Sequence, residues 1–329
     1  PYYLPNLEHI FNKYDIILFD MDGVITSEQR YWDASALTIF QCINKSVDVK
    51  YAMDNVQKIR SDIFCNDKII VLLKERGVNS NWDLTYVTLG IAEMLGTTDF
   101  KKVYEYMADT GYDAFGFYEF LGKNSQLGER NGDKYNYLVD IFQEWYLGNA
   151  LFEKMFRKTP TMPGKSGLIN GEVPIISVEK TQEVFNILSE NKKILGIGTG
   201  RVHYEILGPL ENWNIMQYFD KNRLITYSNI QEAEEEIPNV ALTKPHPYIF
   251  LKGMLGIDYD NKKIIDGNYD NTNIEKTLVV GDAGADLFSA KSAGMDFAAV
   301  LTGVTGAEFF RKNNADYILN SIEDLIEKV

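Results

Sequence analysis

The feature that most constrains the fold is an apolar run that stops at a pair of aspartates, in the segment DIILFDMDGVIT from Asp15 to Thr26. A short continuous apolar run bounded by turn residues, here Ile16–Phe19, is typical of a buried strand in a parallel sheet. Side chains two apart on a strand share a face, so Asp20 and Asp22 point together from its carboxyl end. Ligands bind at that end in open α/β sheets. Two crowded carboxylates repel unless a cation lies between them, which indicates a hard divalent metal ion. Taken alone, however, a DxDG segment is more often only a strand followed by an acidic turn.

The chain of 329 residues exceeds the usual size of a single domain, so two domains are expected. After Thr26 the sequence leaves the α/β pattern for about 150 residues of helical spacing and polar loops. Strands and helices then alternate from residue 178 to the end. Alternation of this kind predicts an α/β fold with a doubly wound parallel (Rossmann-like) sheet, built from residues 1–26 and 178–329. Residues 27–177 are expected to form an α-helical domain inserted after the first strand.

Individual elements can be placed from the apolar runs and their flanking turn residues. The predicted strands after the first are Lys193–Gly198, Arg223–Tyr227, Lys276–Val280, Phe297–Leu301 and Tyr317–Leu319. The predicted helices of the α/β part are Val178–Glu190, Val202–Trp213, His246–Leu255, Ala285–Ala293, Glu308–Asn313 and Ser321–Lys328. In the insertion, helical patterns run from Ser27 to Ile43, Val56–Glu75, Asp83–Leu95, Asp99–Met107 and Tyr135–Phe156.

Composition limits the class of partner. The net charge of −14 argues against nucleic acid and anionic membranes. No run of 18 apolar residues appears, and the first residues lack the pattern of a signal peptide, so a cytoplasmic location is expected. The two cysteines, Cys42 and Cys65, are too few for a disulfide framework or a zinc site and are interpreted as reduced core residues. Nothing in the sequence specifies an oligomeric state.

Two further strand ends carry groups suited to a phosphate. In LGIGTGR a strand ends at Thr199 and Gly200 makes the turn into a helix, whose free N–H groups can bind an anion. Taken alone, such a turn is usually only a connection. In LTKPHPYIF, Lys244 could serve as a fixed cation rather than a solvated surface group. His246 is interpreted as a helix-start residue, and Arg201 fits either a contact to the substrate or to the inserted helical domain, or an ordinary helix start.

The segment LVVGDAGADLFSAKSAG adds two more carboxylates. Asp282 follows a buried strand and could join Asp20 and Asp22 on the cation. Asp286, four residues later, lies on the same side of the following helix. Helix capping is the simpler structural role for both, and for Asp286 it competes closely with metal ligation.

In this order, the four motifs DxDG, Thr, Lys and GDxxxD resemble those of the haloacid dehalogenase-like hydrolase superfamily. The matching residues are Asp20, Asp22, Thr199, Lys244, Asp282 and Asp286. The matched part covers residues 15–26 and about 178–329, and the helical insertion resembles the cap domain of that family. The cap itself shows no specific match.

The resemblance implies roles for these residues. Asp20 would be the nucleophile that forms an aspartyl-phosphate, and Asp22 the general acid and then the general base. Mg²⁺ would be held by the Asp20 and Asp282 carboxylates and the Asp22 main-chain carbonyl. Asp286 is a further candidate ligand. Thr199, Gly200 and Lys244 would bind the phosphoryl oxygens.

The implied function is Mg²⁺-dependent hydrolysis of a small phosphorylated metabolite. Dehalogenases of the family lack the second aspartate, so Asp22 favours phosphate chemistry. A sugar phosphomutase of the β-phosphoglucomutase type remains an alternative, because the sequence does not show how long the phosphoenzyme survives water. No lysine of the insertion has a context that supports the Schiff base of the phosphonatase branch. A non-catalytic phosphate-binding protein is disfavoured because all four motifs are intact.

Overall fold

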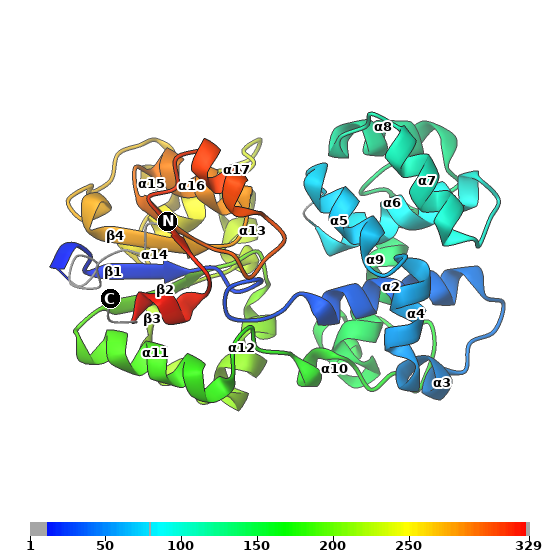
Figure 1. Cartoon of the computed structure of the whole chain (residues 1–329), viewed down its shortest axis with the longest axis horizontal. Coiled ribbons are helices and arrows are strands. Elements are labelled where there is room, and N and C mark those ends of the chain that lie inside the picture. Colours follow the sequence, from blue (N-terminus) through cyan, green and yellow to red (C-terminus); the bar gives the residue numbers. More distant parts are fainter. Residues whose placement is uncertain (1–11, 79, 327–329) are drawn as a thin grey trace. The chain divides into compact units, whose positions relative to one another are not determined.

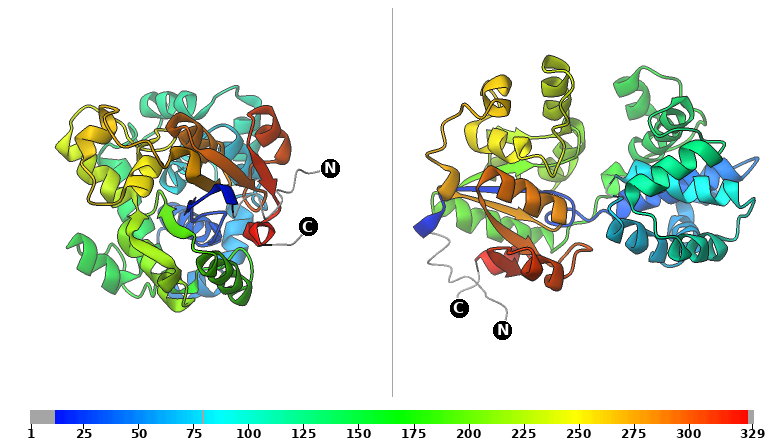
Figure 2. Two further views of the ribbon diagram at one scale, coloured as in Figure 1. Left: turned by 90° about the vertical axis from the view of Figure 1, so that its left-hand side faces the viewer. Right: turned by 90° about the horizontal axis from the view of Figure 1, so that it is seen from above.

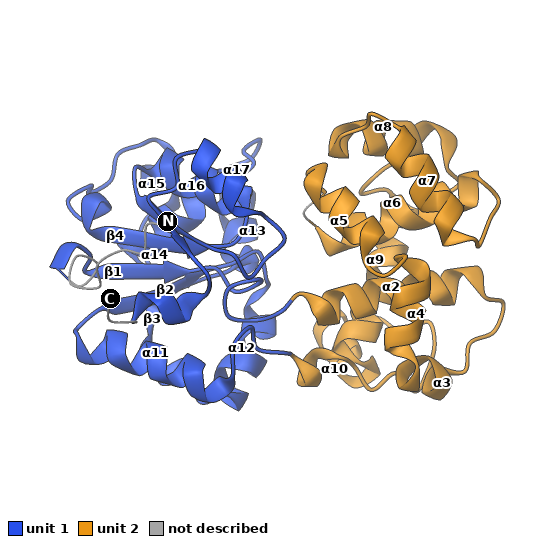
Figure 3. Ribbon diagram, viewed as in Figure 1, with its two compact units in different colours: residues 1–27, 173–329 blue, residues 28–172 orange. Residues whose placement is uncertain are grey.

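The computed structural model describes residues 12–78 and 80–326. The chain divides into two compact units, which are coloured separately in Figure 3. Unit 1 combines the chain up to Ser27 with the chain from Val173 onward, and unit 2 is Glu28–Glu172. Among the described residues, no helix is both long and apolar enough to cross a membrane.

Unit 1 is built on a six-stranded sheet in which all neighbouring strands are parallel. The strands lie in the order β3-β2-β1-β4-β5-β6, and several are labelled in Figure 1. Their bounds are β1 Ile16–Phe19, β2 Ile194–Gly198, β3 Phe219–Ile225, β4 Thr277–Gly281, β5 Asp296–Val300 and β6 Tyr317–Leu319. The α/β fold with a doubly wound parallel sheet, predicted from the alternation of strands and helices, is confirmed.

Helices cover both faces of the sheet, as the view from above in Figure 2 shows. Along β1, Ile17 and Phe19 belong to one apolar core, while Ile16 and Leu18 belong to the other. This alternation explains the continuous apolar run, because a strand buried on both faces has no polar side. The first face is covered by α11 Val178–Glu190, α12 His203–Asn212 and η4 Ile322–Leu325. The second face is covered by α13 Tyr227–Glu236, α14 Tyr248–Leu255, α16 Gly284–Ala293 and α17 Ala307–Lys312.

The strand register brings three strand ends together. Phe19, the last residue of β1, lies opposite Ile197 of β2 and Val280 of β4. Because the strands are parallel, the residues that follow them leave the sheet at the same edge. The segments after β1, β2 and β4 carry three of the four sequence motifs, and the fourth, at Lys244, lies in the loop between α13 and α14.

Unit 2 is helical. It contains α2 Gln29–Ile43, α3 Val49–Asp54, α4 Val56–Ile63, α5 Lys68–Glu75, α6 Asn81–Met94, α7 Phe100–Asp109, α8 Ala114–Asn124, α9 Asp133–Leu147 and α10 Asn149–Phe156. Helix α2 packs against α4, α6 and α9. Two predicted helices are interrupted: Val56–Glu75 breaks where Cys65 and Asn66 take left-handed φ angles of 53° and 55°. The other, Tyr135–Phe156, breaks at Gly148, whose φ is 82°.

Unit 1 departs from the sequence expectation beside β3. The predicted strand Arg223–Tyr227 begins earlier in the structure, at Phe219, and Tyr227 instead opens α13. The reason is local: Thr226 and Asn229 form a reciprocal capping box that starts the helix. The short helix α15 Asn261–Ile265 also lies in a polar, Asn-rich region. Such helices carry too few apolar residues to be seen by periodicity.

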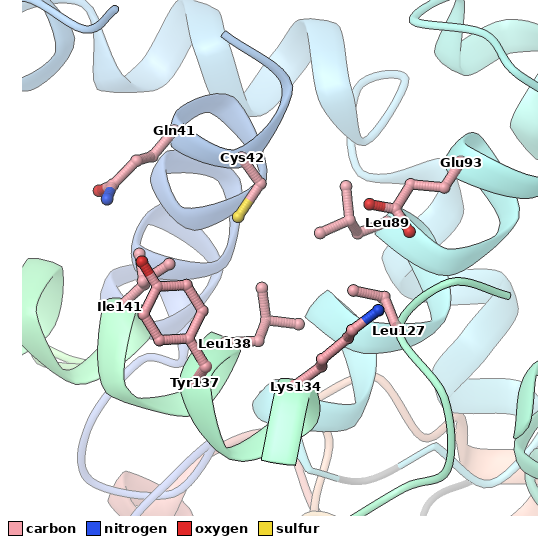
Figure 4. A pocket seen from close by; sticks show the side chains of 9 residues that line it. All are labelled: Gln41, Cys42, Leu89, Glu93, Leu127, Lys134, Tyr137, Leu138 and Ile141. Carbon is pink, nitrogen blue, oxygen red and sulfur yellow. The ribbon is translucent and has the colours of Figure 1, made fainter. Parts of the chain in front are cut away.

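The sequence suggested that both cysteines are core residues, and this prediction is wrong. Cys42 is exposed and Cys65 is partly exposed, and both are free. Cys42 lies near the end of α2, beside a pocket of about 340 Å³ that Figure 4 shows. Cys42 is the second-last residue of α2, which ends at Ile43.

Candidate active site

Asp20 leaves the end of β1 with its backbone still tied to the sheet. Its N–H donates to the Val280 carbonyl at 2.9 Å, and its side chain is almost fully buried. The chain then closes a tight loop in which the Met21 carbonyl accepts from the N–H groups of Ile25 and Thr26, both at 2.8 Å. The Met21 side chain is buried in the core. The apolar strand and this loop therefore fix the position of the Asp20 carboxylate.

Asp282 and Asp286 come from the end of β4 and the first turn of α16. One carboxylate oxygen from each of Asp20, Asp282 and Asp286 lies within 4.8 Å of the other two. All three residues are buried, with Asp286 only 1% exposed. Asp286 also accepts from the Ala283 N–H at 3.2 Å, so it caps the helix as well as joining the cluster. The capping role and the candidate ligand role thus coexist in one side chain.

Two glycines make room for Asp282. A Cβ atom on Gly23 would lie 2.2 Å from Asp282 Oδ2, and one on Gly303 would lie 1.7 Å from the same atom. Gly23 also takes a φ of +74°, which L side chains rarely adopt. Both glycines are therefore needed for the carboxylate to occupy this position. Sequence reasoning missed Gly303, because it lies in a loop far along the chain from any motif.

Lys244 supplies the positive charge of the site. Its Nζ lies 3.0 Å from Asp20 Oδ1 and 2.6 Å from Asp286 Oδ1. Burial lowers the pKa of the Lys244 ammonium, but the carboxylates of Asp20 and Asp286 outweigh burial and raise it above its ordinary value. Lys244 is therefore a permanent cation at neutral pH. The structure brings Asp20, Lys244, Asp282 and Asp286 together. Asp20 and Asp282 follow strands as expected, but Lys244 comes from the loop between α13 and α14 and not from a strand end.

The acidic cluster fits a hard divalent cation. Burial raises the pKa of the Asp20 carboxyl above its ordinary value; the Lys244 ammonium opposes this shift, while the Asp286 and Asp22 carboxylates add to it. A cation beside these oxygens would favour their ionised forms. Carboxylate oxygen is the ligand type that Mg²⁺ prefers. Gly23 and Gly303, which together we call the glycine cradle, leave the space in which the Asp282 oxygen joins the cluster.

Asp22 lies outside that cluster and pairs with Arg201. Arg201 Nη2 donates to Asp22 Oδ1 at 2.6 Å, and Nε lies 3.2 Å from both carboxylate oxygens. The family resemblance implies that the main-chain carbonyl of Asp22 is a metal ligand. The pairing of the Asp22 side chain with Arg201 does not test that role. Arg201 is 2% exposed, so it is a buried partner of Asp22 rather than an ordinary helix-start residue.

The Thr199 turn lies at the end of β2. Thr199 is fully buried, and its Oγ1 accepts from the Arg201 N–H at 3.2 Å. Gly200 is exposed, and a Cβ at this position would meet open space, so the turn itself does not require glycine. His246 lies just before α14, where its Nδ1 accepts from the Tyr248 N–H at 3.2 Å. This contact agrees with the helix-start role proposed for His246.

Comparison with known proteins supports the family resemblance. A family model described as HAD-hydrolase-like matches residues 241–325, a segment that includes Lys244, Asp282 and Asp286. A crystal structure from the Northeast Structural Genomics Consortium is 28% identical, with a TM-score of 0.77, and the match covers 94% of this chain and 97% of that one. The part of the chain that carries Lys244, Asp282 and Asp286 is thus similar to the haloacid dehalogenase-like hydrolases. The family resemblance carried by the four motifs is thereby confirmed.

Two further matches have lower sequence identity. The pyrophosphatase PpaX of Halalkalibacterium halodurans is 26% identical over 151 residues, which are 46% of this chain and 59% of that protein. The match thus spans less than two thirds of that relative's length. A structure described as a predicted phosphoglycolate phosphatase from Haemophilus somnus shares the fold at 14% identity and a TM-score of 0.50, over 95% of this chain and 96% of that one.

Proposed function

We propose that this protein is a Mg²⁺-dependent phosphohydrolase that acts on a small phosphorylated metabolite through an aspartyl-phosphate on Asp20. The observation that supports this most is the cluster in which three buried carboxylates lie within 4.8 Å of one another and Lys244 contacts two of them. Phosphoryl transfer depends mainly on alignment and charge stabilisation, which such a cluster can supply.

In the first step, Asp20 attacks phosphorus while the bond from phosphorus to the leaving oxygen breaks. Asp22 gives its proton to that oxygen, and Lys244 and Thr199 hold the phosphoryl group. In the second step, water attacks the aspartyl-phosphate and gives a proton to Asp22, which releases phosphate and restores the Asp20 carboxylate. Asp20, Asp282 and Asp286, with the Asp22 main-chain carbonyl, are the candidate ligands of Mg²⁺, which when bound would offset charge on the phosphoryl oxygens.

Unit 2 is proposed to act as the cap that selects the substrate. It is a separate helical unit inserted directly after the loop that carries Asp20 and Asp22. A cap that excludes water suits a reaction in which the phosphoenzyme must meet water only at the right step. The cytoplasmic location and the absence of nucleic-acid partners remain predictions from the sequence.

The test is phosphate release from p-nitrophenyl phosphate and a panel of sugar phosphates, nucleotides and phosphoglycolate, with Mg²⁺ and with EDTA. Wild type should release phosphate only with Mg²⁺, and Asp20→Asn should abolish it. Asp15→Asn is the matched control, because Asp15 lies at the other end of β1 and its side chain forms an exposed ion pair with Lys276 at 3.3 Å. Its activity should equal that of wild type.

Three other results would count against the proposal. Release that survives Asp20→Asn would contradict the nucleophile. Sugar-phosphate isomerisation with a persistent phosphoprotein would favour a mutase. No turnover or labelling on any substrate would favour a binding protein.

A further inference from the structure

Arg201 is not one of the residues of the four motifs, yet it forms an ion pair with Asp22, which lies inside the proposed catalytic machinery. We infer that Arg201 is a positioning residue, which holds the Asp22 carboxylate so that Oδ2 exchanges the proton with the leaving oxygen and then with water. This inference rests on the proposed function, because Asp22 has a proton to exchange only if the chain transfers phosphate.

The backbone of Arg201 is fixed on both sides. Its N–H donates to Thr199 Oγ1 at 3.2 Å, and its carbonyl accepts from the Tyr227 N–H at 2.8 Å. The first contact ties Arg201 to the proposed phosphate-binding turn after β2. The second ties it to the capped start of α13. The guanidinium therefore extends from a rigid base, which a group that orients another side chain requires.

The side chains of the pair differ in their access to solvent. The Arg201 side chain is 1% exposed, whereas that of Asp22 is 24% exposed. Arg201 is thus buried, and Asp22 is the member of the pair that a substrate or a water molecule can reach. This arrangement is what we expect if the buried Arg201 orients the Asp22 carboxylate, which the substrate and water can reach.

The two oxygens of Asp22 have unequal contacts. Oδ1 takes the short contact from Arg201 Nη2 at 2.6 Å and lies 3.2 Å from Thr26 Oγ1. Nη2 also donates to Thr26 Oγ1 at 2.9 Å, so Arg201, Asp22 and Thr26 form a closed triangle. Oδ2 has the longer contact, 3.2 Å from Nε. Oδ1 is therefore anchored, and Oδ2 keeps more of its hydrogen-bonding capacity.

The decisive experiment is a double-mutant cycle on phosphate release with Mg²⁺, using wild type, Arg201→Met, Asp22→Asn and the double variant. Loss of orientation should lower kcat for an alkyl phosphate such as glycerol phosphate by roughly 10- to 100-fold in Arg201→Met. In the Asp22→Asn background the same change should cost less than about 2-fold, because a residue that acts through another has no effect once that one is removed.

A second readout separates positioning from a purely structural role. With p-nitrophenyl phosphate the leaving group needs no proton, so the first step should stay fast in Arg201→Met and the second should become slow. The variant should then show a burst of nitrophenol and trapped phosphoenzyme. A variant that is only less well folded would lose both steps together and show no burst.

Arg223→Met is the matched control. Arg223 is a largely buried arginine of unit 1 whose Nη1 donates to the Gly253 carbonyl at 2.7 Å. Its loss should lower the thermal midpoint but leave the ratio of alkyl to aryl phosphate activity unchanged. Equal losses from Arg201→Met in both backgrounds of the cycle, or no burst, would overturn the inference. Wild type without any Mg²⁺-dependent release would instead contradict the proposed function itself.

Discussion

Unit 1 and unit 2 both bury charged side chains, but they balance those charges differently. In unit 2, Glu144 and Lys165 form an ion pair with a 2.5 Å contact and no exposure of either side chain. Glu144 also accepts from the N–H of Thr161 at 2.7 Å and from its hydroxyl at 2.8 Å. One negative and one positive charge meet there, with additional hydrogen bonds.

In unit 1, three carboxylates meet the one ammonium of Lys244. When all three carboxylates are ionised, their negative charge exceeds the positive charge of Lys244 by two, an excess that a divalent cation would balance. Burying such an excess costs stability, so it persists where a ligand offsets it. In unit 2 the buried charges compensate each other within the pair, while the excess of carboxylates in unit 1 supports the proposal that this cluster binds a metal ion.

The largest expected effect is on the balanced pair. Lys165→Met leaves the Glu144 carboxylate buried without its cation and should lower the free energy of unfolding by about 3–5 kcal/mol. The measurement is chemical denaturation of the whole chain, with kcat per folded molecule measured alongside. Lys158→Met is the matched control: its ion pair with Asp140 is partly exposed, so its loss should have little effect. A fall in kcat per folded molecule in Lys165→Met would contradict the purely structural role of the Glu144–Lys165 pair.

The next largest effect is expected in the cluster of Asp20, Asp282, Asp286 and Lys244. Lys244→Met removes the cation that would hold the phosphoryl oxygens, so kcat/KM for phosphate release should fall by about 10²–10³-fold. Steady-state kinetics at saturating Mg²⁺ measures the fall, and circular dichroism checks that the variant folds. Activity within a few-fold of wild type would remove Lys244 from the proposed machinery.

A smaller effect sharpens the comparison at the glycine cradle. Gly303→Ala places a Cβ where Asp282 Oδ2 now lies, so the carboxylate must move. We expect the Mg²⁺ concentration for half-maximal activity to rise about 10- to 100-fold, as for changes that misorient a metal ligand. Gly306→Ala is the matched control, because its Cβ would meet nothing within 4 Å and its φ is −80°. Equal Mg²⁺ dependence of the two variants would contradict a metal-binding role for Asp282.

Much of the site could be predicted because it follows from strand ends. Asp20, Asp282 and the residues near them leave parallel strands at one edge, so a correct strand assignment already brings them together. Lys244 and Asp286 follow from the same order of elements. The sheet was predictable for the same reason, since a strand buried on both faces shows as an apolar run such as IILF.

Other features depend on contacts between segments distant in the sequence. The Arg201–Asp22 pair joins residues 179 positions apart, and no local pattern marks it. Gly303 matters only because Asp282 approaches it. The predicted strand Arg223–Tyr227 includes Tyr227, whereas the capping box at Thr226 and Asn229 starts a helix there. Helix breaks at Cys65 and Asn66 arise from left-handed backbone angles that apolar spacing does not reveal.

The measurement that tests the central contrast most directly is Mg²⁺ binding by isothermal titration calorimetry. The proteins are wild type, Asp282→Asn and Lys158→Met, with Ca²⁺ as a second titrant to detect non-selective acidic binding. We predict one Mg²⁺ per chain in wild type and in Lys158→Met, and affinity reduced by at least about 10-fold in Asp282→Asn. Equal binding by Asp282→Asn and wild type, or no binding by wild type, would contradict the assignment of the cluster of Asp20, Asp282 and Asp286 as a metal site.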